Sequence, residues 1–278
     1  MIFRRHIPSP PLGQFVQFFW YYEGWDGGHS MEHVLPDGAF ELVINLRDES
    51  RKLFDRQDHT RHTLFRRGWI SGAQSRYLVI DALPGASMIG AHFQPGGAAP
   101  FLGAPAAEFG DRVVEFDAVW GGGARDLRDE LLAAKGPSAK FRVLERFLAG
   151  RLRGAQERDI RRDRVDWAIR QFCEQPSAAS VAATAARAGV SHKHFIQEFR
   201  DRVGLAPKVF CRVRRFQKAL AQANAAQKVN WAEVAHSGGY YDQAHLINDF
   251  RACTGLTPAR YLEFGEHDPQ FLPVSQPG

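Results

Sequence analysis

The feature that most constrains this chain is a segment that occurs twice. The sequence "HFIQEFRDRVGLAP" runs from His194 to Pro207, and "HLINDFRACTGLTP" runs from His245 to Pro258. The two segments align without a gap at an offset of 51 residues. Apolar residues at helical spacing, followed by a glycine, predict an amphipathic helix that ends in a left-handed turn. The C-terminal part of the chain therefore has to contain the same helix twice.

A shorter helix is predicted before each copy. The two segments are "VAATAARA" and "WAEVAHS", and a glycine turn follows each of them. The predicted helix N-caps are Ser180, Ser191, Asn230 and Asp242, and the predicted turn glycines are Gly189 and Gly239. A short helix, a tight turn and a second helix form a helix-turn-helix motif. From glycine to histidine, the second turn is one residue longer than the first.

The segment between the two motifs, "PKVFCRVRRFQKALAQANAA", is predicted to be a single helix. About twenty residues span roughly 30 Å in a helix, and successive major grooves on one face of DNA lie about 34 Å apart. Two recognition helices on such a spacer could therefore lie in adjacent grooves of one duplex. The cations of this helix suit phosphate groups, and they are Lys208, Arg212, Arg214, Arg215 and Lys218.

The first 122 residues predict a β-rich domain. Short apolar runs separated by glycine-bearing turns lie at 15–22, 40–46, 77–83 and 87–93. In "AFELVINL", Phe40, Leu42, Ile44 and Leu46 face one way, with Glu41 and Asn45 on the other side, which predicts a half-buried strand. Several short strands with turns between them are typical of a barrel or a sandwich.

A helical pattern begins at about residue 123. The segments "ARDLRDELLAA" and "SAKFRVLERFLAGRL" are amphipathic and are separated by Gly136 and Pro137, which predicts a helical hairpin. Leu144, Leu148 and Leu152 form an apolar stripe that either pairs two copies of the chain or packs on the β-rich domain. We favour the dimer seam.

The predicted fold class is α+β. The expected divisions are residues 1–122 for a β-rich sensing domain, 123–162 for the hairpin and a charged linker, 163–264 for a domain with two helix-turn-helix motifs, and 265–278 for a tail.

In residues 163–264 the sequence resembles the DNA-binding domain of the AraC/XylS family of bacterial transcriptional regulators. The resemblance rests on "GLAPKVF…RRFQKAL" between the motifs and on "GGYYDQAHLINDFRACTGLTPARYL" at the end. Two positions depart from the family pattern: Leu246 stands where an aromatic residue is common, and Leu262 stands where an arginine is usual. The first departure is expected to loosen the core of the second motif, and the second to remove a phosphate contact.

The front domain resembles an uncharacterised regulatory domain found ahead of such motif pairs, with the stretches "LPDG…LVINL" and "HFQPGG". The family resemblance implies a cupin-like barrel that binds a small effector and pairs two subunits into a homodimer. It also implies double-stranded DNA as the main partner, RNA polymerase as a second partner if the protein activates transcription, and a cytoplasmic location.

The outer faces of the repeated helices carry residue types that read base edges. Glutamine pairs with adenine, lysine and arginine pair with guanine, and isoleucine contacts the thymine methyl group. The expected base readers are Lys193, Ile196, Gln197, Arg200, Gln243, Ala244, Ile247 and Asn248. The expected phosphate contacts are His194, Lys208, Arg212, Arg215, His245 and Arg251. Contacts inside the protein are the alternative for the two histidines, Arg212 and Arg215. The second face is less basic, so weaker or less specific reading is expected there.

Aromatic and histidine side chains of the front domain are candidates for a ligand site. Phe18, Trp20, Tyr22 and Trp25 could line an effector pocket, with strand core as the alternative. The histidines lack the H-x-H spacing typical of metal cupins, so we expect no metal site and no cofactor. They are His29, His33, His59, His62 and His92.

Composition permits these expectations and argues against others. A formal net charge of +5 permits a polyanionic partner without identifying one. Cys173, Cys211 and Cys253 show no C-x-x-C spacing and are expected to be reduced structural thiols. No cysteine lies in the first 172 residues, which argues against a DNA-repair alkyltransferase. No apolar run approaches the length of a membrane span.

We therefore expect a regulator and not an enzyme. The alternatives are a metal-dependent cupin-type enzyme and a ligand-free dimeric DNA-binding protein.

Overall fold

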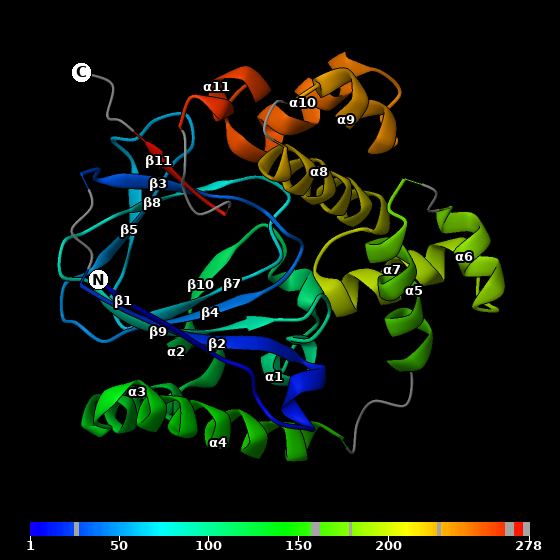
Figure 1. The fold of residues 1–278 in the computed structure, drawn as a ribbon. Helices are drawn as coiled ribbons and strands as arrows, with labels where there is room; N and C mark the ends of the chain where they lie inside the picture. Colours follow the sequence, from blue (N-terminus) through cyan, green and yellow to red (C-terminus); the bar gives the residue numbers. More distant parts are fainter. Residues whose placement is uncertain (25–27, 157–161, 178–179, 227–228, 265–269, 275–278) are drawn as a thin grey trace.

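The structure is a computed structural model, and it describes residues 1–24, 28–156, 162–177, 180–226, 229–264 and 270–274. A β-rich front domain and a helical C-terminal domain pack side by side (Figure 1). Trp25, residues 157–161 of the predicted linker and most of the predicted tail lie outside the described residues.

The front domain contains two antiparallel sheets. The six-stranded sheet has the strand order β1 (Ile2–His6), β2 (Val16–Glu23), β9 (Ser87–Phe93), β4 (Glu41–Asn45), β7 (Gly68–Ser71) and β10 (Val113–Glu115). The five-stranded sheet has the order β11 (Phe271–Val274), β3 (Met31–Val34), β8 (Leu78–Asp81), β5 (Arg51–Phe54) and β6 (His62–Phe65). The predicted strands at 15–22, 40–46, 77–83 and 87–93 are confirmed as β2, β4, β8 and β9.

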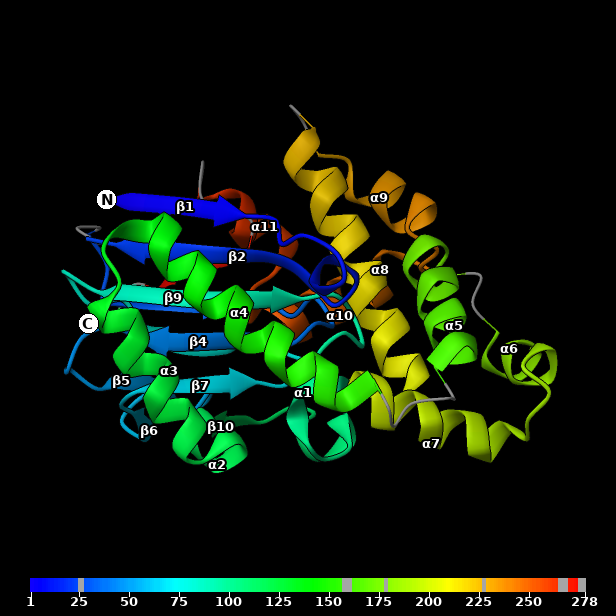
Figure 2. The ribbon, with the colours of Figure 1, turned by 90° about the horizontal axis from the view of Figure 1, so that it is seen from below.

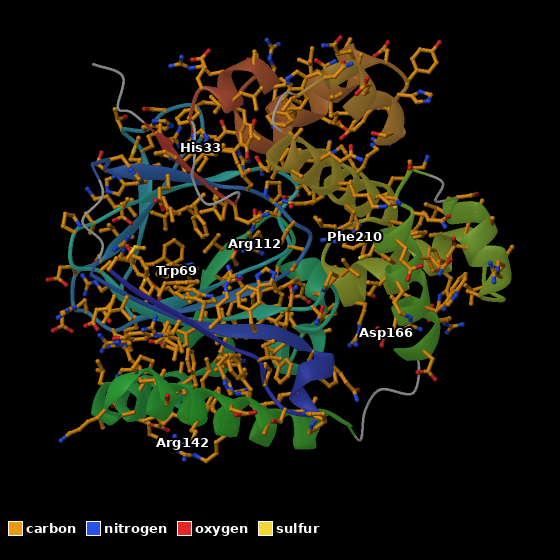
Figure 3. The ribbon with its side chains drawn as sticks, in the orientation of Figure 1. His33, Trp69, Arg112, Arg142, Asp166 and Phe210 are labelled. Atoms are coloured by element: carbon orange, nitrogen blue, oxygen red, sulfur yellow. The ribbon has the colours of Figure 1, made fainter. Side chains whose placement is uncertain are left out.

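The two sheets face each other, and Trp69 of β7 lies between them (Figure 3). Trp69 lines a small cavity together with Leu53 and Ile80 of the five-stranded sheet. Within the described ranges, no strand of one sheet is paired with a strand of the other. The described strands therefore form a two-sheet arrangement, and the closed cupin-like barrel stays a prediction.

Strand β4 is buried on both faces, which corrects the prediction of a half-buried strand. Leu42 and Ile44 have no exposed surface, and Val43 on the opposite face is 7% exposed. Asn45 is buried as well, and its amide donates to the carbonyl oxygens of Glu49 (2.8 Å) and Arg66 (2.9 Å). The prediction was wrong because the second sheet covers the face that alternation assigned to solvent.

Helices α3 (Gly122–Ala133) and α4 (Gly136–Gln156) form the predicted hairpin and cover the outer face of the six-stranded sheet (Figures 1 and 2). Leu144, Leu148 and Leu152 are at most 1% exposed and belong to the same core as Phe19 of β2. The structure thus contradicts the dimer seam and selects the alternative, in which the stripe packs on the front domain. The remaining elements of this domain are α1 (Ala99–Leu102), α2 (Phe116–Trp120) and the 3-10 turns Leu12–Gln14 (η1) and Ala106–Glu108 (η2).

The C-terminal domain consists of two three-helix units and a final short helix. The first unit is α5 (Arg162–Glu174), α6 (Val181–Arg187) and α7 (His192–Val203); the second is α8 (Pro207–Ala225), α9 (Trp231–Ser237) and α10 (Gln243–Thr254); α11 (Pro258–Leu262) follows. The single connecting helix predicted between the motifs is confirmed as α8, with Pro207 in its first turn, where proline's missing N–H costs nothing.

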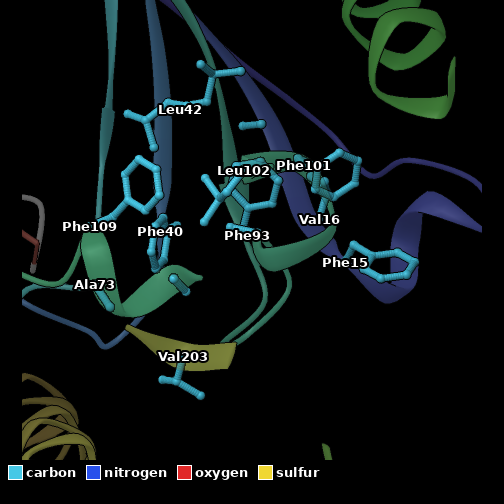
Figure 4. Packing of buried hydrophobic residues seen from close by; sticks show 14 of the residues in the cluster. Phe15, Val16, Phe40, Leu42, Ala73, Phe93, Phe101, Leu102, Phe109 and Val203 are labelled. Carbon is cyan, nitrogen blue, oxygen red and sulfur yellow. The ribbon is translucent and has the colours of Figure 1, made fainter. Parts of the chain in front are cut away.

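The first unit shares one continuous hydrophobic core with the front domain. Phe195, Phe199 and Val203 of α7 belong to the same buried cluster as Phe40 of the front domain. Figure 4 shows Val203, the last residue of α7, at the edge of this cluster. The second unit packs mainly in two smaller clusters, one of which also contains Leu35 and Leu272 of the front domain. Both units therefore share buried apolar contacts with the front domain.

The chain returns to the front domain near its end. Residues 271–274 form β11, which pairs with β3 at the edge of the five-stranded sheet. Leu272 is fully buried against Phe216 and Phe250 of the second unit. This strand lies in the predicted tail. Sequence reasoning missed it because a four-residue strand interrupted by Pro273 has almost no pattern.

The burial of the α4 stripe gives a stability prediction. Leu148→Ala should lower the free energy of unfolding by about 2–5 kcal/mol, since it removes a fully buried side chain. Leu132→Ala, at a position on α3 that is 44% exposed, is the control and should change it by about 0.5 kcal/mol or less. Urea unfolding followed by circular dichroism measures both. If Leu148→Ala changed the molecular mass in solution and left the unfolding free energy intact, the stripe would be a subunit seam after all.

Candidate nucleic-acid interface

The repeat extends beyond the two motifs into the first helix of each unit. Ala168 and Ile169 in α5 correspond, at the same offset of 51 residues, to Ala219 and Leu220 in α8, and all four side chains are buried. Sequence comparison missed this extension because few residues are identical there. Shared burial shows that the repeated unit is three helices and not two.

The predicted caps and turns are confirmed by hydrogen bonds and backbone angles. Ser180 accepts from the N–H of Ala183 (3.2 Å), Ser191 from His194 (3.3 Å), Asn230 from Ala232 (3.1 Å) and Asp242 from His245 (2.7 Å). Gly189 and Gly239 have φ values of 69° and 72° in the turns. The turn before each recognition helix is thus fixed by local chemistry.

A charged group joins the recognition helix of the first unit to its first helix. Glu198 of α7 lies 2.8 Å from Arg164 of α5 and 3.0 Å from His194 one turn away. His194 keeps half of its side-chain surface exposed at the start of α7.

The second unit repeats this group at the same offset. Asp249 of α10 lies 3.0 Å from Arg215 of α8 and 3.9 Å from His245. The Arg215 guanidinium also lies 4.6 Å above the ring of Tyr240. Arg215 is therefore paired inside the protein, which is the predicted alternative to a phosphate contact. In both units an arginine holds the acid that faces the exposed histidine.

The predicted base readers lie on accessible faces of the two recognition helices. Lys193, Gln197, Arg200, Gln243, Ala244 and Asn248 are exposed, whereas Ile196 and Ile247 are half-buried. Gln197 donates to the carboxylate of Asp201 at 2.9 Å. Leu246, the departure from the family pattern expected to loosen the second core, is fully buried, so the aliphatic side chain fills that position.

The basic residues of α8 do not form an open stripe. Arg212 donates to the carbonyl of Ser75 (3.2 Å) and Arg214 to that of Asp37 (3.0 Å), both in the front domain. Lys218 donates to the Glu174 carbonyl of α5. Lys208 is exposed. Charge spacing along a helix could not show this, because the front-domain carbonyls compete with phosphate for the same donors.

The front domain contacts the first recognition helix at its C-terminal end. Helix α7 ends at Gly204, with φ +88°, against the Phe40 ring and the Ala106 carbonyl. A Cβ added to Gly110 would lie only 2.1 Å from the Gly204 carbonyl oxygen. Glycine is required on both sides of this backbone contact.

The front domain contacts the second recognition helix at the equivalent place. His33 of β3 donates from Nδ1 to the Thr254 carbonyl at 2.8 Å, next to the C-cap Gly255 (Figure 3 labels His33). The His33 ring packs on Tyr77 with 4.3 Å between ring centroids. Burial lowers the pKa of His33, so the neutral ring supplies this single donor. Both recognition helices are thus held by their C-terminal ends.

A buried charged cluster lies in the front domain beside this interface. The His92 imidazole of β9 lies between the carboxylates of Glu41 (Nδ1 to Oε2, 2.5 Å) and Asp37 (Nε2 to Oδ2, 3.0 Å). Trp20 donates to Glu41, and Phe18 stacks on the imidazole at 4.9 Å. Burial alone would lower the pKa of His92, but the two carboxylates raise it to about 11, so the ring is charged.

Asp37 links this cluster to the DNA-binding domain. The side chain of Asp37 binds His92, and its backbone carbonyl accepts from Arg214 of α8. Phe18 and Trp20, two of the aromatic residues predicted to line an effector pocket, therefore contact a charged cluster next to α8. Tyr22 is half-buried farther along β2.

An open cavity lies at the other end of β4, and Phe18, Trp20 and Tyr22 do not line it. It has a volume of about 510 Å³, within the range of small-molecule sites. Its lining residues are Asn45, Arg47, Glu49, Arg51, Leu83, Pro84, Gly85 and Ala86.

The remaining candidate groups are histidines of the front domain and the three cysteines. His29 lies 2.8 Å from Glu32, and the described residues contain no cluster of three or more side chains placed to hold a metal. All three cysteines are free, and burial raises the pKa of Cys211 and Cys253 to about 12. No helix in the described ranges is long and apolar enough to cross a membrane.

Comparison with known proteins matches both parts of the chain to families. Residues 4–115 match a domain of unknown function (DUF6597), and residues 184–263 match the helix-turn-helix domain. Among solved structures, the chain is similar to ToxT from Vibrio cholerae, with 9% identity over 88% of this chain and 98% of that chain and a TM-score of 0.46. A second ToxT structure, with unsaturated fatty acid bound, gives 10% identity, 88% and 94% coverage and a TM-score of 0.46. No curated protein matches significantly.

Two three-helix units, each with a capped recognition helix, define a double helix-turn-helix protein that binds DNA. The family match identifies the type: residues 184–263 belong to an AraC-type helix-turn-helix domain, and the chain is a DNA-binding transcriptional regulator.

Proposed function

We propose that one copy of this protein reads two successive major grooves of an operator. The observation that carries the proposal is the attachment of both recognition helices to the front domain at Gly204 and Gly255, their C-cap glycines. Helix-turn-helix proteins direct the N-terminal residues of the recognition helix at the bases. Attachment at the C-terminal ends leaves both reading ends accessible at once.

The first motif supplies most of the base specificity. Lys193 and Gln197 are exposed and lie one turn apart, so they suit a guanine and an adenine in the same groove. Arg200 extends this face by a further turn. In the second motif Gln243 and Asn248 take adenine, while Ala244 and Ile247 offer only apolar contact to thymine.

Phosphate contacts come from groups that keep their surface exposed. Lys208 and Arg251 are exposed cations, and His194 and His245 stand half-exposed at the starts of the recognition helices. Arg212 and Arg215 are engaged inside the protein, so their role is to hold the two motifs in place and not to bind the duplex.

The base-reading role is tested by substitution in the first motif. Lys193→Ala and Gln197→Ala should each reduce the preference for the operator over random DNA by about 1–3 kcal/mol, because each removes a contact to a base edge. Operators are first selected from a random duplex library with the full-length protein, and affinities are measured by fluorescence anisotropy.

The control is Gln171→Ala, an exposed glutamine on α5 outside the recognition face. It should leave the preference unchanged. Equal discrimination by wild type and both substituted proteins would remove Lys193 and Gln197 as readers.

The front domain is proposed to regulate this reading by binding a small effector. The cavity of about 510 Å³ between β4, β5 and the turn before β9 is the proposed site. Asn45, which lines the cavity, and Glu41 lie at opposite ends of strand β4. Glu41 binds His92, and His92 binds Asp37, whose carbonyl accepts from Arg214 of α8. An effector that displaces β4 would alter the spacing between the two readers. Pairing of two copies and contact with RNA polymerase stay predictions from the family resemblance.

The substitution Arg214→Ala removes the hydrogen bond between α8 and Asp37, so it tests whether effector binding changes DNA affinity through this contact. A metabolite that raises the melting temperature of the full-length protein should also change its affinity for the operator. In Arg214→Ala the metabolite should still raise the melting temperature, but the operator affinity should no longer respond. Lys218→Ala, which loses a contact within the C-terminal domain, is the control and should respond like wild type. An effector response that survives Arg214→Ala would disprove this route, and a library without any binder would favour the ligand-free alternative.

A further inference from the structure

The two helix-turn-helix motifs differ by one residue, and the structure identifies it. The turn backbones correspond up to the residue after the glycine: Val190 donates to the Ala185 carbonyl at 3.2 Å, and Tyr240 donates to the Ala235 carbonyl at 2.9 Å. In the first motif the next residue is the N-cap of the recognition helix. In the second motif Tyr241 intervenes before the N-cap Asp242.

The residue before the extra tyrosine is held firmly inside the unit. Tyr240 is 6% exposed, with its ring under the Arg215 guanidinium and edge-on to His245 at 5.3 Å. Because Tyr240 points inward and Asp242 must cap α10, the inserted side chain can only project outward. Tyr241 is 94% exposed, more than any other large hydrophobic side chain among the described residues.

An exposed tyrosine at this point lies where a recognition helix meets DNA. It directly precedes Asp242, the N-cap of α10, and the N-terminal residues of such a helix face the groove in helix-turn-helix complexes. Within the described part of the chain, no hydrogen bond of the Tyr241 hydroxyl is found. Tyrosine offers a rigid apolar ring and one polar tip, and tyrosine hydroxyls are common donors to DNA phosphates.

The second recognition helix is less basic than the first at the end that meets the groove. At the offset of 51 residues, Ala244 stands where the first helix has Lys193, whereas Arg251 corresponds to Arg200 farther along. The cap Asp242 adds a negative charge at the same end. The hydroxyl of Tyr241, which lies beside this cap, can donate a hydrogen bond to a phosphate oxygen although it carries no charge.

We infer that Tyr241 anchors the second motif to the sugar-phosphate backbone at the edge of the major groove, with its hydroxyl donating to a phosphate oxygen. The inference rests on the proposed engagement of both motifs with one duplex. Tyr241 positions α10 in its groove and carries no base specificity.

The contact is tested by three substitutions at an exposed position that does not support the fold. Tyr241→Ala and Tyr241→Phe should each weaken binding about tenfold, because both lose a hydrogen bond to a charged acceptor. The loss should be similar on selected operators and on random duplex, as expected for a phosphate contact. The slope of log affinity against log salt should not change, since tyrosine carries no charge. Tyr241→Arg should restore affinity and steepen that slope by about 0.9, the value for one added ion pair.

Ile7→Ala, which alters an exposed apolar side chain of the front domain (77% exposed), is the control and should bind like wild type. Three results would overturn the inference: unchanged affinity of Tyr241→Ala, a loss confined to one operator sequence, or full affinity of Tyr241→Phe. A wild-type protein that selects no duplex from the library would instead refute the proposed function itself.

Discussion

The attachment of both recognition helices to one rigid front domain is the constraint on which the rest of the structure depends. Each helix ends in a left-handed glycine, and each glycine meets a front-domain aromatic ring, Phe40 against Gly204 and Tyr77 against Gly255. A side chain at either glycine would strain the backbone and separate the domains. The distance and angle between the two recognition helices are therefore set by the front domain as well as by α8. The front domain is thus in direct contact with both recognition helices.

The same arrangement explains why α8 is basic and yet largely enclosed. Arg212 and Arg214 donate to carbonyl groups of the front-domain loops between β7 and β8 and between β3 and β4. Within each unit, an arginine of the first helix binds an acid of the recognition helix, Arg164 with Glu198 and Arg215 with Asp249. The duplication thus preserved the charges that orient the recognition helix, in addition to its apolar core.

The helical domain was predictable from sequence because its signals are local. Caps, turn glycines and helical periodicity all act within a few residues, and the four caps and α8 formed where these signals placed them. The front domain was predictable only in part. Alternation placed β4 correctly but misjudged its second face, since covering by another sheet is a long-range property. The roles of Arg212 and Arg214 depended on carbonyl groups more than 130 residues away, which spacing along one helix cannot reveal.

The most direct test of a rigid two-reader protein is the spacing between its two half-sites. Full-length protein is bound to a selected operator and to the same duplex with about five base pairs, half a helical turn, inserted between the two footprints. With both readers fixed to one front domain, the inserted duplex should bind no more tightly than a duplex that retains only the first half-site. Equal affinity for the original and the lengthened duplex would show that the two motifs move independently, and would contradict the account.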